Sequence, residues 1–196
     1  MIHVRPIMQA IVDGHRLPLS GIHGLRHWAR VYENGLRVAE ATGGDPELVL
    51  LFALFHDARR ENDHHDPEHG LRGGQLAKSL HGELFDIGSD RLATLDYACR
   101  HHTDGMTHAD PTIQPCWDAD RLDLARVGIQ PDPKRLCTPA GGERKTSGSS
   151  VRFGGRKVSF ASEGGLVRGC SVIGHSPLVA AEEGLLVVSG ALLSPS

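Results

Sequence analysis

Histidine and aspartate side chains that could bind a metal occur in three separate segments of the chain. His27 opens the segment H-W-A-R-V. His56 and Asp57 are adjacent, and Asp120 lies within D-A-D-R-L-D. Imidazole together with carboxylate suits Mn, Fe, Co, Ni or Zn better than Ca. The chain has 13 histidines, 12 of them at or before His108, and histidine is the commonest metal ligand. These residue types indicate a site for a divalent transition metal if the fold brings the three segments together.

The element that must position the His-Asp doublet is a wholly apolar helix. Eight apolar residues, 48–55, lead directly into His56 and Asp57. Residues 45–47, D-P-E, supply an N-cap acceptor, a proline at the first helical position and an acid in the first turn. A segment that is apolar on every side is buried all round, and a buried carboxylate is costly unless it is paired. We therefore predict a central helix that ends at a paired His-Asp doublet; a helix end that surfaces into solvent is the alternative.

A helix over residues 22–41 is predicted to present His27 to the core. Its apolar residues recur every three or four positions, and two glycines at 43–44 end it. His27 projects from the edge of this buried stripe, and His23, four residues earlier, shares its face. The alternative for His27 is a histidine that is satisfied within the core.

A helix over residues 112–127 is predicted to carry the aspartate of the third segment. Asp120 lies at the centre of its apolar face and Asp123 at the margin; the face is formed by Ile113, Cys116, Trp117, Leu124 and Val127. Asp118 lies on nearly the opposite side, so its replacement by alanine is expected to be almost neutral. An aspartate centred on a buried face needs a cation, a metal or several donors around it. A structural salt bridge to an arginine is the alternative to a metal.

Further histidines lie near the ends of two other predicted helices. The start signal D-P-E at 66–68 places one histidine in a first helical turn, and glycines at 73–74 would let a backbone or a ligand approach that helix closely. A helix over residues 90–102 ends in two adjacent histidines on its inward side. The candidates from these two helices are His69, His101 and His102.

The H…HD…D arrangement resembles the HD-domain superfamily of metal-dependent phosphohydrolases. The resemblance covers roughly residues 20–137 and depends on H-W-A-R-V, the doublet within an apolar helix, and D-A-D-R-L-D. It implies an all-α, HD-domain-like helical bundle. Members with two or more metals add histidines between the doublet and the last aspartate, as this chain does, and some carry an extra acidic ligand where His23 stands. The implied ligands of one metal are His27, His56, Asp57 and Asp120, and those of a second are drawn from His69, His101 and His102.

A metal held in this way supports phosphoryl chemistry, since a bound divalent ion lowers the pKa of a coordinated water from 15.7 towards ~7. Asp57 could bridge two metals or orient that water, and His69 is the second catalytic candidate. Arg60 and Arg121 could offset charge on a phosphoryl group or contact it, with a surface arginine as the alternative. The leading hypothesis is a metal-dependent phosphohydrolase that acts on a small phosphorylated metabolite or nucleotide. The alternatives are an HD-fold di-iron oxygenase and a non-catalytic metal- or ligand-binding module.

Composition bears on the partners and on the cellular setting. The 196 residues carry a formal net charge of −3, which favours neither a nucleic-acid polymer nor a membrane as the partner. The four cysteines form no C-x-x-C pair, which suits a reducing compartment. The N-terminus shows no secretory pattern, and no apolar run approaches ~18 residues. We expect a cytoplasmic protein whose partner is a small phosphorylated substrate.

The composition changes after residue 138. Residues 139–150 have the composition of a flexible linker, and residues 151–196 are rich in glycine and serine, with short apolar runs and no helical period. We therefore expect a metal-binding helical domain over residues 1–138 and a poorly structured tail over residues 139–196, in which brief strands are the alternative.

Overall fold

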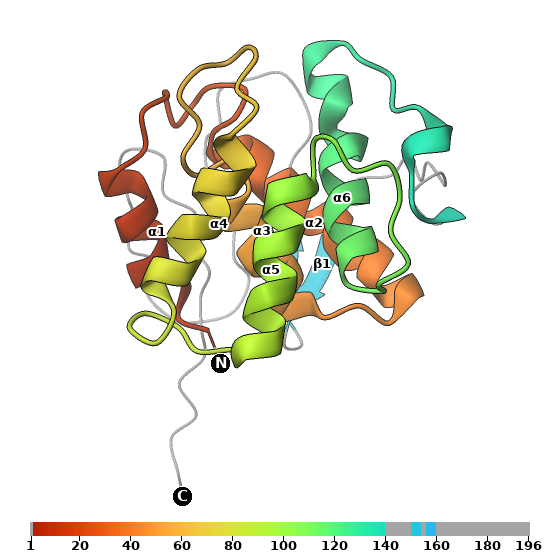
Figure 1. Ribbon diagram of the computed structural model, residues 1–196. Coiled ribbons are helices and arrows are strands. Elements are labelled where there is room, and N and C mark those ends of the chain that lie inside the picture. The colour runs from red at the N-terminus through yellow and green to blue at the C-terminus, as the bar shows by residue number, and fades with distance from the viewer. Residues whose placement is uncertain (1, 140–149, 154–155, 160–196) are drawn as a thin grey trace, which may run out of the picture. The chain divides into compact units, whose positions relative to one another are not determined.

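A computed structural model describes residues 2–139, 150–153 and 156–159 of the chain. Over residues 2–139 the described elements are helical (Figure 1). Apart from them, β1 (Ser150–Phe153) and β2 (Arg156–Ser159) pair antiparallel, with Val151 opposite Val158. None of the described helices is long and apolar enough to span a membrane. The helices are α1 (Val4–Asp13), α2 (Leu25–Thr42), α3 (Pro46–Phe55), α4 (His69–Leu80), α5 (Ser89–His101), α6 (Ile113–Leu122), η1 (Asp123–Val127) and η2 (Pro133–Arg135).

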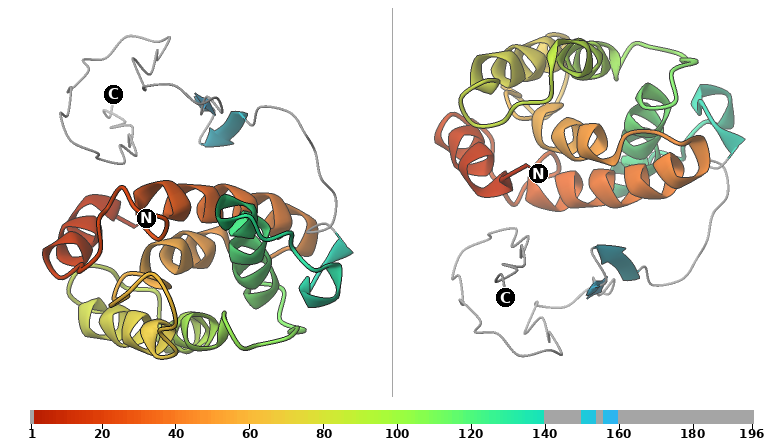
Figure 2. Two further views of the ribbon diagram at one scale, coloured as in Figure 1. Left: turned by 90° about the horizontal axis from the view of Figure 1, so that it is seen from above. Right: turned by 90° about the horizontal axis from the view of Figure 1, so that it is seen from below.

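Helix α3 lies at the centre of this helical domain. Figure 2 shows α1, α2, α4, α5 and α6 arranged around it, and each of the five contacts it. Every residue from Leu48 to Phe55 is buried. The side chain of Asp45 accepts hydrogen bonds from the backbone N–H groups of Glu47 (2.9 Å) and Leu48 (3.2 Å), which satisfies donors that the first turn leaves free. The prediction of a capped, fully buried central helix is confirmed.

Two elements differ from the sequence predictions. Helix α1 was not predicted, although Ile7, Met8 and Ile11 follow helical spacing and are buried. The helix predicted over residues 112–127 ends at Leu122 and tightens into the 3₁₀ helix η1. Val127, which was assigned to the apolar face, is 38% exposed. A 3₁₀ helix has fewer residues per turn than an α-helix, so side chains after Leu122 point in other directions than they would on an unbroken α-helix.

The assignment of Asp118 to the exposed side of this helix was wrong. Asp118 is fully buried, because residues 137–138 return to cover that side of α6. Its carboxylate accepts hydrogen bonds from the backbone N–H groups of Cys137 (2.6 Å) and Thr138 (3.0 Å) and from the Thr138 hydroxyl (2.8 Å). Substitution of Asp118 by alanine, which the sequence predicts to be almost neutral, would instead leave three donors without their acceptor.

Helix α4 approaches its neighbours through glycine. A Cβ atom at Gly73 would collide with the carbonyl oxygen of Phe55, and one at Gly70 would collide with that of Cys99. The backbone of α4 therefore lies directly against the end of α3 and against α5. This contact brings the first residue of α4, His69, beside the turn that follows α3, and it confirms the prediction of a close backbone approach at residues 73–74.

Candidate metal centre

Side chains from three helical segments converge just beyond the end of α3. His27 comes from α2 and Asp120 from α6, while His56 and Asp57 lie in the turn that follows α3. The Nε2 atoms of His27 and His56 are 3.0 Å apart. His27 Nε2 also lies 3.5 Å from Asp57 Oδ2 and 3.4 Å from Asp120 Oδ1. We call these four residues the first histidine group.

The spacing of the first histidine group fits ligands of one ion. Metal bonds to histidine nitrogen and carboxylate oxygen are ~2.1 Å long, so neighbouring ligands on one ion lie about 3.0–3.4 Å apart. The three distances from His27 Nε2, 3.0 to 3.5 Å, match this spacing. The distances from His56 Nε2 to Asp57 (3.7 Å) and Asp120 (4.0 Å) are slightly longer. The donor set and its spacing therefore suit a divalent metal.

His56 is held as a neutral ligand. Its Nδ1 lies 3.1 Å from the carbonyl oxygens of Phe52 and Ala53. A carbonyl oxygen only accepts, so Nδ1 is the donor, and Nε2 of the neutral ring directs its lone pair into the group. Burial lowers the pKa of His56 to about 3, which keeps the ring neutral at physiological pH.

The carboxylates around His27 favour positive charge beside its Nε2 atom. Burial alone would lower the pKa of His27, but hydrogen bonds with Asp120, Asp123 and Asp57 outweigh it and raise the pKa to about 10. Conversely, burial would raise the pKa of Asp57, but His56 and hydrogen bonds from His23 and His27 hold it well below its usual range. The electrostatic field at His27 Nε2 thus stabilises a cation, which can be a proton or a metal ion.

Asp57, His69 and His102 form a second histidine group. The Nε2 atoms of His69 and His102 are 2.9 Å apart, and Asp57 Oδ1 lies 3.3 Å from the first and 4.0 Å from the second. Each Nδ1 faces a carbonyl oxygen, that of Asp66 for His69 and that of Cys99, at 2.7 Å, for His102. In their neutral forms both rings therefore direct Nε2 lone pairs toward one point. Burial lowers the pKa of His69 to about 4, which favours its neutral form.

The carboxylate of Asp57 is shared by the two groups. Its Oδ2 faces His27 and His56, and its Oδ1 faces His69 and His102. The side chain is only 2% exposed. A carboxylate with one oxygen directed to each of two histidine groups can bridge two cations or hold one on either side.

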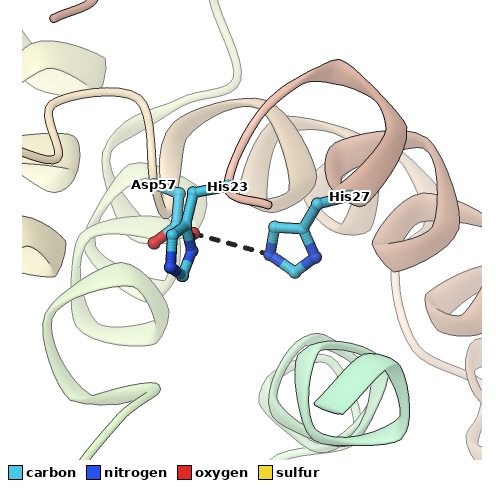
Figure 3. A group of neighbouring side chains, drawn as sticks. All are labelled: His23, His27 and Asp57. Carbon is cyan, nitrogen blue, oxygen red and sulfur yellow. Dashed lines mark hydrogen bonds and ion pairs between the residues drawn. The ribbon is translucent and has the colours of Figure 1, made fainter. Parts of the chain in front are cut away.

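His23 supports Asp57 from the turn that precedes α2. Its Nδ1 lies 2.8 Å from Asp57 Oδ2, and the dashed line in Figure 3 marks the contact of the same carboxylate with His27. His23, His27 and Asp57 also satisfy the spacing expected of metal ligands. Arg126 of η1 places Nη2 3.4 Å from His23 Nδ1. His23 therefore helps to fix Asp57 and is a further candidate ligand.

Asp123 contacts the candidate site, although the sequence placed it only at the margin of a buried face. Its Oδ2 accepts from His27 Nδ1 at 2.7 Å, and its Oδ1 accepts from Arg30 Nε at 2.6 Å. A carboxylate behind a metal-binding histidine fixes the ring and makes it a better ligand. The signal in the sequence was the pairing of two i, i+3 patterns: H-x-x-R on α2 faces D-x-x-D, which runs from Asp120 to Asp123.

A cavity of about 310 Å³ opens over both histidine groups. Its base includes Asp57, His69, His102 and Asp120. Its walls carry several arginines together with two apolar side chains from the segment that follows α6; these are Arg60, Arg126, Arg135, Leu124 and Ile129. Another cavity, of about 400 Å³ beside Arg16 and Arg59, includes none of the candidate ligands. Of these two cavities, the smaller one is therefore the one lined by candidate ligands.

Two sequence candidates are not used as expected. His101 is exposed and packs against Tyr97, with ring centroids 4.5 Å apart, so the structure brings His102 and not His101 to the second group. Arg121 lines the cavity but donates to the carbonyl oxygens of Gly105, Met106 (2.8 Å) and Arg135. These bonds occupy its guanidinium with the cavity wall, which argues against the predicted phosphate contact.

Comparison with solved structures bears on the fold. The chain is similar to a protein from an uncultured Thermotogales bacterium, described as a predicted HD superfamily hydrolase, whose crystal structure was determined at 1.45 Å resolution. The TM-score is 0.56 at 27% sequence identity, over 71% of this chain and 81% of the other. The chain has an HD-domain fold. No family model matches the sequence, and no curated protein matches it significantly.

The HD-domain fold and the histidine groups agree with each other. The all-α bundle predicted from the H…HD…D pattern is confirmed. Buried His and Asp groups with ligand-like spacing occur where an HD domain is expected to hold its metal. Together these findings support a metal-dependent HD hydrolase at the level of the superfamily.

Proposed function

We propose that this HD-domain protein is a metal-dependent phosphohydrolase that acts on a small phosphorylated metabolite or nucleotide. The observation that carries the proposal is the position of Asp57, which directs one oxygen to each histidine group at the base of a cavity with arginine-containing walls. When bound, a divalent ion such as Mn, Fe, Co, Ni or Zn polarises a phosphoryl oxygen and makes water more acidic. His27, His56, Asp57 and Asp120 would hold it, and His69, His102 and Asp57 would hold a second.

The protein's own residues would position the substrate and balance its charge. The guanidinium of Arg126 is held by the carbonyl oxygens of Ile22 (2.9 Å) and Asp123 (3.2 Å), with Nη2 beside His23. Arg60 lies on the other side, 3.2 Å from Asp57 Oδ1. A fixed cation such as Arg126 beside a phosphoryl group stabilises the negative charge that develops during transfer without having to reorganise, and Arg60 adds a second positive charge.

The size and lining of the cavity support a small substrate. About 310 Å³ is at the lower end of the volumes of small-molecule sites, ~300–1,000 Å³. Leu124 and Ile129 would contact the part of the substrate beyond the phosphoryl group. We propose no nucleic-acid polymer and no membrane as a partner.

The test is phosphate release from a panel of phosphorylated metabolites and nucleotides by manganese-loaded, iron-free protein. We expect hydrolysis that is lost in Asp57→Asn, because each histidine group then loses a charged oxygen. A di-iron oxygenase could use the same ligands, and the basic lining of the cavity favours hydrolysis over it. Turnover that needs both iron and dioxygen would refute the proposal. Metal binding without any turnover would favour a non-catalytic module.

A further inference from the structure

The guanidinium of Arg60 lies against the second histidine group. Its Nη1 is 3.2 Å from Asp57 Oδ1 and 3.0 Å from His69 Nε2. The Arg60 side chain is 11% exposed. Its Nε and Nη2 donate to the backbone carbonyl oxygens of Asn62 (3.2 Å) and His64 (3.1 Å). A positive group of the protein itself therefore contacts two of the three ligand atoms in this group.

Arg60 donates hydrogen bonds to only two of the three ligand atoms in the second histidine group. His69 Nε2 and His102 Nε2 are 2.9 Å apart, and both Nδ1 atoms are directed at carbonyl oxygens. In the described residues, Arg60 forms hydrogen bonds with His69 and Asp57 but has none with His102. Two neutral rings with facing lone pairs at this distance repel each other unless a cation lies between them. A divalent ion would satisfy all three ligand atoms, whereas a guanidinium satisfies two.

A metal and the guanidinium cannot both use these two atoms in the observed arrangement. An ion bound to Asp57 Oδ1 and His69 Nε2 would lie ~2.1 Å from each, on the side that Nη1 approaches. Two positive groups so close together in a buried site repel strongly. Among the described residues, no arginine or lysine forms a hydrogen bond or ion pair with the ligand atoms of the first histidine group, whose neighbours are histidines and carboxylates.

We propose that Arg60 and a second divalent cation compete for the position beside Asp57 Oδ1 and His69 Nε2. The first group then holds its ion tightly, and the second group is loaded only when the guanidinium is displaced. This inference rests on the metal centre of the proposed function and adds a control of its occupancy. It predicts two binding steps of unequal affinity, the weaker of which is set by Arg60.

Displacement of Arg60 links metal loading to anion binding. Residues 61–65 are exposed, so the segment that accepts from Arg60 Nε and Nη2 does not confine the side chain within a packed core. Arg60 also lines the cavity above the two groups. Once Nη1 leaves Asp57 and His69, its N–H groups can be directed to an anionic substrate in that cavity. By linkage, a bound anion that attracts Arg60 must also favour loading of the second metal.

The test is calorimetric titration of metal-stripped, full-length protein with Mn²⁺, in wild type, Arg60→Gln and Arg135→Gln. Arg135 is an exposed arginine of the same cavity whose side chain donates to the carbonyl oxygen of Thr103 at 3.5 Å, so it controls for the general loss of positive charge. We expect Arg60→Gln to tighten the second step by about tenfold or more, the factor expected when a competing charge-assisted hydrogen bond is removed. Arg135→Gln should change both steps by less than about threefold.

A second measurement follows Arg60 directly by NMR in ¹⁵N-labelled wild-type protein. The Arg60 Nε–H resonance should remain in place during the first equivalent of Zn²⁺ and shift during the second. This resonance is assigned as the signal that is lost in Arg60→Gln. An unmoved resonance would overturn the inference, as would a second step that Arg60→Gln leaves unchanged or weakens relative to Arg135→Gln. A single binding step in all three proteins would overturn it too, while leaving the first group intact. Absence of the first step would instead refute the metal centre itself.

Discussion

Asp123 offers a sharp test of the candidate metal centre, because it contacts a proposed ligand without being one. In Asp123→Asn the shape of the side chain is kept, but the negative charge behind His27 is lost. The amide oxygen can accept from His27 Nδ1 or from Arg30, whereas the carboxylate accepts from both, at 2.7 and 2.6 Å. The amide nitrogen would then face the remaining donor, and the His27 ring would no longer be held in one orientation.

The size of the effect follows from these contacts. Loss of a carboxylate behind a metal-binding histidine typically costs 10–100-fold in metal affinity. A hydrogen bond to a charged group contributes ~1.5–3 kcal/mol when buried, and the Arg30 bond counts for less because that side chain is 43% exposed. We therefore expect metal affinity to fall by roughly 10–100-fold and the free energy of unfolding of the metal-free protein to fall by about 2 kcal/mol.

Asp118→Asn is the matched control. Asp118 is a buried aspartate like Asp123, but it lies in α6, accepts from residues 137–138 and forms no hydrogen bond with the site histidines. It should lower the free energy of unfolding and leave metal affinity within about threefold of wild type. Calorimetric metal titration and urea unfolding measure the two quantities separately. Equal metal affinities in the two variants would refute the view that Asp123 orients His27.

Three further predictions address the elements around the centre. Burial raises the pKa of Asp66, but hydrogen bonds from Arg72 and the Glu61 amide outweigh it and hold the pKa below its usual value. Asp66→Asn should therefore lower the free energy of unfolding by about 1.5–3 kcal/mol near neutral pH, and the difference from wild type should shrink as pH falls below about 4; a difference that is constant with pH would contradict this. Gly73→Ala should lower the melting temperature and weaken metal binding, since its Cβ would displace α4 from the end of α3; wild-type values for both would show that the contact is not constraining. Truncation after Thr138 should leave a cooperatively unfolding, metal-binding domain, and loss of cooperative thermal unfolding would show that later residues are needed.

The sequence predicted those features whose causes are local. The central helix follows from eight apolar residues and a cap at Asp45, all within one segment. The close approach at Gly73 follows from the absence of a side chain. His56 and Asp57 could be placed at the end of a buried helix, where an unpaired carboxylate would be costly. In each of these cases, the residues of one short segment are enough to explain the structure that the segment adopts.

Helix α1 was missed although its helical spacing is local, whereas the other features that were missed depend on distant segments. A helical wheel identifies one apolar face, but Asp118 is buried because residues 137–138 cover the other side of α6. The choice between His101 and His102 depends on the orientation of the last turn of α5 relative to α4, which no spacing within α5 determines. The contacts of Arg60 and Arg121 likewise depend on which carbonyl oxygens the folded chain presents to them. The domain boundary at residue 138 stays a prediction, and most of residues 139–196 lies outside the described part of the chain.

The glycine contact of α4 affects how related sites can be recognised from sequence. Because main chain lies against main chain at Gly70 and Gly73, no larger side chain can be accommodated there by repacking of its neighbours. The position of His69 relative to the doublet is therefore set by residues that carry no functional group. A search for this arrangement in other chains should treat H-G-x-x-G-G as one unit and should give its glycines the weight of ligands. A chain with the histidine but with bulky residues at those positions would not be expected to build the second histidine group.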